Sequence, residues 1–307
     1  MKAFQLPGYN LAPAWADIPE PVAGPGEVLV RIKAAALNPL DLKLQTGAMQ
    51  AYFPLAFPYT QASDFSGTVE QVGAGVGQWR VGDQVVGRTP PPQGGALASL
   101  IAVSADLLAP APKSLPLVEA AGIPTAAATA WQALFEVADL KPGQTVLVHA
   151  SAGGVGSFAV QFARARGARV IATASGTGLD MVRALGADQV IDHRSEDFAA
   201  RVTDVDVVLD TIGGETQQRS FAVLRQSGIL VAAASPPNEA LAKAHNVRAA
   251  FVFLTLDGAR LAPLVAMVDD QPLTVLIDRV VPSADVEQAF QHLASGRAKG
   301  KIIVTIS

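Results

Sequence analysis

A run of small residues from Ser151 to Gly156, Ser-Ala-Gly-Gly-Val-Gly, lies between an apolar stretch and a helix-forming stretch. Residues 145–150 are typical of a buried strand, and residues 155–166 place apolar side chains at helical spacing before Gly167. Glycines in such a turn let the backbone approach an anion, and the N-terminus of the helix offers it unpaired N–H groups. The order strand, glycine turn, helix predicts a site for the pyrophosphate of a dinucleotide.

The end of the next strand indicates which dinucleotide binds. An NAD site usually carries Asp or Glu there, which accepts from the ribose 2′-hydroxyl. Residues 172–178 contain no carboxylate but offer the hydroxyls of Ser175 and Thr177, and His193 and Arg194 follow the third expected strand. We therefore expect NADPH as the cofactor, with these four residues near its 2′-phosphate. The alternative is an ordinary solvated loop.

The chain has no cysteine, which excludes disulfides and thiol nucleophiles. Its histidines, at positions 149, 193, 245 and 292, show none of the short spacings of a zinc site, so we expect no metal. Nicotinamide chemistry without a Lewis acid suits conjugated acceptors, because a reduced quinone is a phenol with a pKa of about 10. A weak proton donor or water then suffices, whereas a simple ketone yields a far more basic alkoxide.

Ser151 stands where the usual Gly-x-Gly-x-x-Gly pattern has its first glycine, so the motif alone is a weak indication. Its context strengthens it, because four more short apolar runs follow, each after a helix-like stretch, at residues 189–193, 205–212, 228–234 and 248–253. With the two strands that flank the glycine helix they give the strand count of a doubly wound parallel sheet. We expect an α/β fold. A glycine turn in an unrelated α/β protein is the alternative.

Composition and charge exclude several other classes of protein. The chain has 307 residues, half of them hydrophobic, and a formal net charge of −4 with both signs scattered along it. This pattern argues against a nucleic-acid-binding or anionic-membrane surface. Residues 1–20 contain no continuous apolar stretch of the signal-peptide kind, and residues 120–135 fall short of a membrane span. We expect a cytoplasmic protein.

Six motifs in order resemble the medium-chain dehydrogenase/reductase superfamily, and its zinc-free quinone oxidoreductase branch in particular. They are Asn38-Pro-Leu-Asp-Leu-Lys43, Asp64-Phe-Ser-Gly67, Val81-Gly-Asp-Gln-Val-Val-Gly87, Gly94-Gly-Ala-Leu-Ala98, the glycine turn and Asp210-Thr-Ile-Gly-Gly214. The resemblance implies a two-domain, usually dimeric NADPH-dependent reductase of quinones or conjugated carbonyls. It implies a Rossmann domain over residues 119–256 and a β-rich, GroES-like substrate domain over residues 1–118 and 257–307.

The resemblance also implies site residues. Asn38 and Lys43 match the active-site loop of the family, and Tyr52 or Tyr59 in the following loop is a further candidate donor; Asn38 could equally cap local backbone, and the family often has tyrosine where Lys43 stands. Asp41 and Asp64 are expected to be structural acceptors. Residues matched along the cofactor are Thr129, Ser151, Ala152, Gly153, Gly154, Val155, Ile212, Ala234, Phe251, Phe253 and Lys301.

Three functions remain open at this point. The first is an NADPH:quinone reductase, and the second is an alkenal or enoyl reductase that shares the hydride step. The third is an NADPH-binding regulatory protein with little turnover. The pocket is expected to be shaped by residues 45–60 and 90–95.

Overall fold

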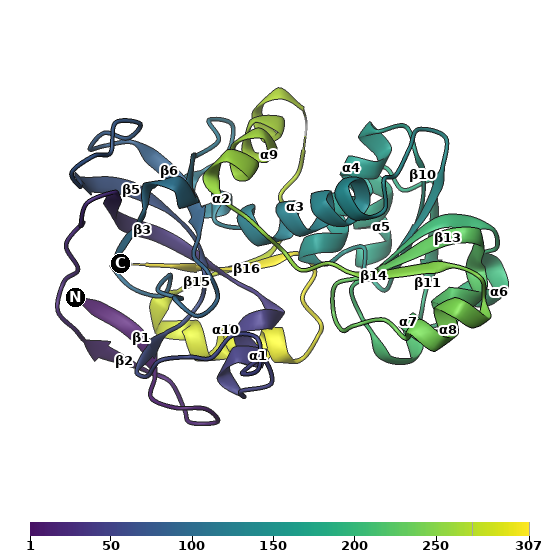
Figure 1. Ribbon diagram of the computed structural model, residues 1–307, viewed down its shortest axis with the longest axis horizontal. Coiled ribbons are helices and arrows are strands. Elements are labelled where there is room, and N and C mark those ends of the chain that lie inside the picture. The colour runs from purple at the N-terminus through teal and green to yellow at the C-terminus, as the bar shows by residue number, and fades with distance from the viewer. Residues whose placement is uncertain (272, 307) are drawn as a thin grey trace. The chain divides into compact units, whose positions relative to one another are not determined.

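The computed structural model describes residues 1–271 and 273–306, which form two compact units (Figure 1). The terminal unit consists of Met1–Thr125 and Leu256–Ser307, and the central unit of Ala126–Thr255. The predicted boundary at residue 118 falls inside helix α2 (Leu117–Ala120), which packs on strands β3 (Glu27–Leu37) and β5 (Asp64–Val72). The terminal unit includes this helix and continues to Thr125.

The central unit is built on a parallel sheet with strand order β11-β10-β9-β12-β13-β14. In chain order this is 3-2-1-4-5-6, the arrangement of a doubly wound dinucleotide-binding fold, which confirms the predicted α/β class. The strands are β9 (Thr145–Val148), β10 (Arg169–Ala174), β11 (Gln189–Asp192), β12 (Val205–Asp210), β13 (Leu224–Ala232) and β14 (Arg248–Phe251).

Helices connect these strands by parallel crossovers. They are α4 (Gly154–Ala165), α5 (Gly178–Ala184), α6 (Phe198–Arg201), α7 (Gly214–Ser220) with the short 3-10 helix Phe221–Val223, and α8 (Glu239–Ala244). Before β9 come α3 (Pro124–Trp131), which starts in the terminal unit, and a π-helical turn (Gln132–Val137). Right-handed crossovers on the two sides of β9 place α4 and α7 on opposite faces of the sheet (Figure 1). All strands therefore present their carboxyl ends at one edge.

The terminal unit contains two sheets. A small sheet has the order β2-β1-β4, and the larger sheet runs β15-β16-β3-β5-β6-β8, with β7 also paired to β3. The remaining strands are β1 (Lys2–Leu6), β2 (Ala14–Asp17), β4 (Tyr59–Thr60), β6 (Gln84–Arg88), β7 (Leu100–Ser104), β8 (Leu108–Pro110), β15 (Ile277–Pro282) and β16 (Lys301–Thr305). The helices, besides α2, are α1 (Pro39–Gln45), α9 (Gly258–Asp270), α10 (Val286–Ala294) and two short 3-10 helices, Ala105–Leu107 and Ser283–Asp285.

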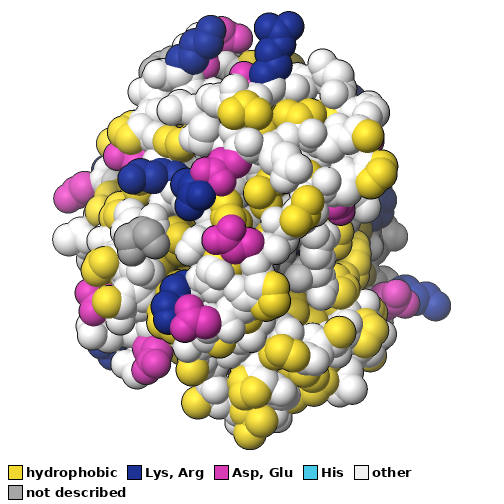
Figure 2. Space-filling model, turned by 90° about the vertical axis from the view of Figure 1, so that its left-hand side faces the viewer, with side chains coloured by type: hydrophobic (Ala, Val, Ile, Leu, Met, Phe, Trp, Pro, Cys, Tyr) yellow, Lys and Arg dark blue, Asp and Glu magenta, His cyan; other side chains and the backbone are white. Residues whose placement is uncertain are grey.

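Each unit has its own hydrophobic core. In the terminal unit Phe4, Phe65 and Phe290 pack together with the inner faces of β3 and β16. In the central unit Phe198 and Phe221 pack against the sheet. On the face drawn in Figure 2, acidic and basic side chains alternate among apolar ones, in keeping with the scattered charge of the sequence.

Candidate active site

The glycine turn lies between β9 and α4, at the carboxyl edge of the central sheet. The left-handed backbone conformation falls on Ala150, with φ of 47°, so Ser151 can replace the usual first glycine without strain. Ser151 is buried, its Oγ donates to Val148 O at 2.6 Å, and its N–H donates to Thr173 O at 3.0 Å. The serine therefore ties the turn to two adjacent strands.

Gly156 makes the close approach that this turn requires. A Cβ atom at Gly156 would lie 2.4 Å from Ala150 O and 2.7 Å from the Ser151 Cα, which no side chain tolerates. Helix α4 starts directly behind this contact, and its N-cap is Gly153, which has no side chain to cap the first N–H groups. The cradle and the free helix N-terminus fit a dinucleotide pyrophosphate.

The central unit brings the other predicted cofactor residues of its strands to the same edge. Ser175 and Thr177 follow β10, with Thr177 at the N-cap of α5, and His193 and Arg194 follow β11 and are exposed. Ile212 follows β12 and is 48 % exposed, and Phe253 follows β14 and is 43 % exposed. The strands expected to reach Ile212 and Phe253 end earlier, at Asp210 and Phe251. Half-buried Ala234 follows β13, and buried Thr129 lies on α3.

Asp210 explains why β12 ends where it does. Its buried carboxylate accepts from the backbone N–H groups of Ile212 and Gly213, each at 2.9 Å, and so turns the chain out of the sheet. Gln217 on α7 donates to the same carboxylate at 2.9 Å. These hydrogen bonds leave the Ile212 side chain exposed at the edge.

His149, at the end of β9, was not assigned a role from the sequence. It is buried between Thr173 Oγ1 at 3.1 Å and Ser220 Oγ at 2.9 Å. Burial lowers the pKa of His149 to about 4, so the ring is neutral near pH 7. A neutral ring hydrogen-bonded to two hydroxyls stabilises the sheet and is not set up as a metal ligand.

A second set of polar side chains lies inside the terminal unit and has Asp64 at its centre. The fully buried Asp64 accepts from Asn38 Nδ2 at 3.0 Å and from Thr125 Oγ1 at 2.6 Å, and Lys301 Nζ lies 3.7 Å away. Arg88 Nε donates to Thr125 Oγ1 at 2.9 Å. The prediction that Asp64 is a structural acceptor is confirmed. Arg88 and Thr125 were missed, since only the tertiary fold brings them together.

Asn38 is the N-cap residue of helix α1, which starts at Pro39. Its amide nitrogen is directed to Asp64, and its amide oxygen accepts from Lys301 Nζ at 2.6 Å. Lys301 also donates to Leu37 O at 3.0 Å, and burial lowers the pKa of Lys301. Both ends of the Asn38 amide are thus engaged within the protein, and Lys301 is buried with them.

Asp41 lies in the first turn of α1 and accepts from the Asn38 N–H at 2.7 Å. Burial raises the pKa of Asp41 to about 7, and the nearby Asp64 carboxylate adds to the shift. Lys43, on the same helix, is half-buried, and Tyr52 in the following turn is 61 % exposed. Of the predicted donors, Lys43 and Tyr52 are therefore the ones with side chains partly open to solvent.

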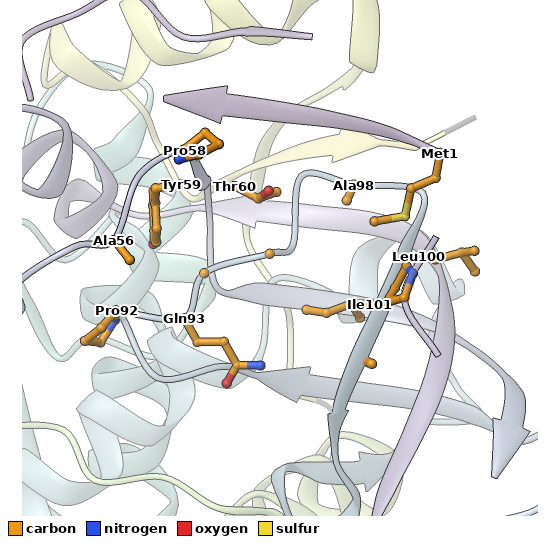
Figure 3. Close-up of a pocket in the computed structure, with 14 residues that line it drawn as sticks. Met1, Ala56, Pro58, Tyr59, Thr60, Pro92, Gln93, Ala98, Leu100 and Ile101 are labelled. Carbon is orange, nitrogen blue, oxygen red and sulfur yellow. The ribbon is translucent and has the colours of Figure 1, made fainter. Parts of the chain in front are cut away.

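Tyr59 is not available as a donor. It is buried, its hydroxyl donates to Pro91 O at 2.7 Å, and burial raises its pKa. An open groove beside it is bounded by Pro58, Thr60 and the Pro92–Gly95 loop (Figure 3). These belong to the two segments expected to shape a pocket, but Asn38, Lys43 and Tyr52 do not line this groove.

Within residues 1–271 and 273–306, no three His, Cys, Asp or Glu side chains are grouped so that they could hold a metal ion. In the same part of the chain, no helix has the length and apolar character needed to cross a bilayer.

Known proteins match this geometry. Residues 24–113 match the family model of the alcohol dehydrogenase GroES-like domain, and residues 185–304 match that of the zinc-binding dehydrogenases. The solved quinone oxidoreductase from Coxiella burnetii superimposes with a TM-score of 0.92 at 30 % identity, covering 100 % of this chain and 99 % of that one.

Two curated relatives are also similar along most of their length. The mitochondrial NAD(P)H oxidoreductase RTN4IP1 of Danio rerio is 31 % identical over 92 % of this chain and 84 % of its own. The 2-methylene-furan-3-one reductase of Solanum lycopersicum is 34 % identical over 99 % of this chain and 79 % of its own. With the parallel sheet, the glycine cradle and the separate mixed sheet, these matches show that the chain belongs to the quinone-oxidoreductase-like branch of the medium-chain dehydrogenase/reductase superfamily.

Proposed function

We propose that this NAD(P)H oxidoreductase uses NADPH to reduce quinones or related conjugated carbonyls, without a metal. One observation carries the cofactor preference: the loop after β10 offers the hydroxyls of Ser175 and Thr177 and contains no carboxylate between residues 175 and 179. A negatively charged 2′-phosphate is not repelled by a carboxylate there, and Arg194 on the neighbouring loop supplies a positive charge.

The residues of the central unit hold and orient the cofactor. The N–H groups at the start of α4 and the backbone at Gly153 receive the pyrophosphate, and Gly156 keeps that helix close to β9. A bound nicotinamide supplies a hydride, which is the difficult part of the reaction. The protein is then left with positioning the acceptor and its oxygen.

For the acceptor, the terminal unit offers weak donors. We assign contact with the acceptor oxygen to Lys43 first and Tyr52 second, because their side chains are partly open to solvent whereas Asn38 is buried. Asn38 then serves to fix the start of α1. Donors of this strength suit an oxygen whose conjugate acid is a phenol, with a pKa of about 10.

Reduction of aliphatic enones or enals is the second candidate, favoured by the similarity to a 2-methylene-furan-3-one reductase. The experiment that separates the candidates follows the absorbance of NADPH with a quinone, an enal and an unconjugated ketone in parallel. We expect the quinone to be reduced fastest and the ketone not at all. Faster reduction of the enal would favour the second candidate, and tight NADPH binding without oxidation by any acceptor would indicate a regulatory protein.

A further inference from the structure

Gln217 connects two loops at the carboxyl edge of the central sheet. Its side chain, on α7, is only 4 % exposed, although glutamine is usually a surface residue. The Nε2 group donates to Asp210 Oδ2 at 2.9 Å and to Ser235 O at 3.1 Å. Asp210 is the last residue of β12, and Ser235 lies in the loop that follows β13. One amide therefore joins the exits of two neighbouring strands.

Each of these loops carries a residue that faces the edge. Asp210 holds the backbone of Ile212 and Gly213, which leaves Ile212 exposed. On the other side, Ala233 N donates to Asp210 O at 2.8 Å and Ser235 O is held by Gln217, so Ala234 lies between two fixed points. The positions of both loops depend on the same pair of side chains, Asp210 and Gln217.

The two loops touch, which makes their relative position sensitive to small shifts. Gly213 has φ of 81°, and a Cβ atom there would lie 2.8 Å from Ser235 Oγ. Loss of the Gln217 bonds would leave the Asp210 carboxylate and the Ser235 carbonyl short of a partner inside the protein. Buried polar groups without partners are costly, so the loops would move toward water.

In a doubly wound sheet the first half binds the adenosine half of the dinucleotide, and the second half receives the other nucleotide. Strands β12 and β13 belong to the second half. We propose that Gln217 is a positioning residue that fixes the loops after β12 and β13 for the nicotinamide half of the cofactor. This inference rests on the proposed nicotinamide cofactor, and it concerns one half of that cofactor only.

The test compares the whole cofactor with its adenine half. Calorimetry on the full chain would compare wild type with Gln217→Met. It would measure the affinity for NADPH and its adenine fragment 2′,5′-ADP, and for NADH and its adenine fragment 5′-AMP. We expect Gln217→Met to weaken dinucleotide binding by about tenfold, the scale of one lost hydrogen bond, and to leave the adenine fragments within about twofold. Gln217→Glu, which places a second carboxylate against Asp210, should show the same split and serves if the Met variant does not fold.

Gln144→Met is the matched control. Gln144 is partly buried and, like Gln217, makes two side-chain hydrogen bonds, to Asp206 Oδ1 at 3.2 Å and from Lys141 N at 2.8 Å, but it precedes β9 at the opposite edge. It should leave all affinities unchanged. Unchanged dinucleotide affinity in the Gln217 variants, or equal weakening of dinucleotides and fragments, would overturn the inference alone. Failure of wild type to bind either dinucleotide would overturn the proposed function and this inference with it.

Discussion

Lys301 and Asn38, far apart in the sequence, are joined by a hydrogen bond of 2.6 Å between the Lys301 ammonium and the Asn38 amide oxygen. Strand β16 thereby fixes the N-cap residue of α1. The ammonium is buried beside the fully buried Asp64, and Arg88 lies in the same cluster. The charges in this cluster compensate one another, so the removal of one should be costly.

Replacing Lys301 with methionine should lower the free energy of unfolding by about 3 kcal/mol or more, because a buried carboxylate loses one of its cations. Urea unfolding would measure this change. Lys2→Met is the control, since Lys2 pairs with Asp17 at 2.7 Å on the surface, where a pair is screened by solvent. Equal stability of the two variants would contradict the compensated cluster.

Asp41 should make stability depend on pH. Its pKa is raised to about 7 in the folded chain, whereas an unfolded aspartate titrates near pH 4. The folded state therefore binds the proton more tightly, and the stability that this proton contributes is present below about pH 4 and lost as the pH rises to about 7. Asp41→Asn should flatten this decline in urea unfolding measured across that range. If the free energy of unfolding falls equally in wild type and variant as the pH rises, Asp41 is not the group responsible.

The cofactor preference should respond to one residue. Ser175→Asp places a carboxylate beside the site expected for the 2′-phosphate and should shift the ratio of NADPH to NADH affinity by about tenfold or more toward NADH. Fluorescence titration of both cofactors measures the ratio. Ser175→Ala, which adds no charge, should change it much less. If the wild type binds NADH as tightly as NADPH, the predicted preference for NADPH is wrong.

Activity should be independent of metal ions. The chain has no cysteine, and its neutral, buried His149 is already bonded to two hydroxyls. Treatment with a chelator should leave turnover unchanged, and elemental analysis of the purified protein should find no stoichiometric zinc. One zinc per chain that is lost together with activity would exclude the metal-free mechanism.

The proton donors should be separable from the positioning residues. Lys43→Ala should reduce kcat/KM for a quinone by roughly tenfold, which corresponds to a loss of about 1.4 kcal/mol of transition-state stabilisation. Tyr52→Phe should have the second-largest effect. Asn38→Ala should lose activity to a similar degree and stability as well, because its amide bonds Asp64 and Lys301. Exposed Lys33→Ala is the control. If both Lys43→Ala and Tyr52→Phe keep wild-type kinetics, neither side chain is the proton donor, and water donates the proton.

The sequence predicted the central sheet well because each of its strands is a short apolar run. It failed where a side chain from elsewhere sets the backbone. The prediction also missed the start of β13, which begins at Leu224 and not at Gly228, because residues 225–227 are exposed and carry no apolar pattern. The left-handed residue of the glycine turn proved to be Ala150, and no propensity indicates alanine there.

The candidate site was predicted unevenly for the same reason. Motifs located Asn38, Asp64 and the glycine turn because their residues are contiguous in sequence. Arg88, Thr125 and Gln217 gave no signal, since their partners are distant in sequence and each contact exists only after folding. The amide of Asn38 illustrates the limit: the family resemblance suggested a donor, and in the fold the amide bonds Asp64 and Lys301.

The place of β16 in its sheet affects how the chain folds during synthesis. Residues 34–37 of β3 pair with β16, which is formed by residues 301–305 and so follows the whole central unit in the sequence. Until they arrive, that edge of β3 is open and Asp64 lacks its lysine, while the central unit already has all its strands. Nascent chains should thus expose an unpaired strand segment until β16 has been synthesised, and we expect the terminal unit to need a chaperone more than the central unit does.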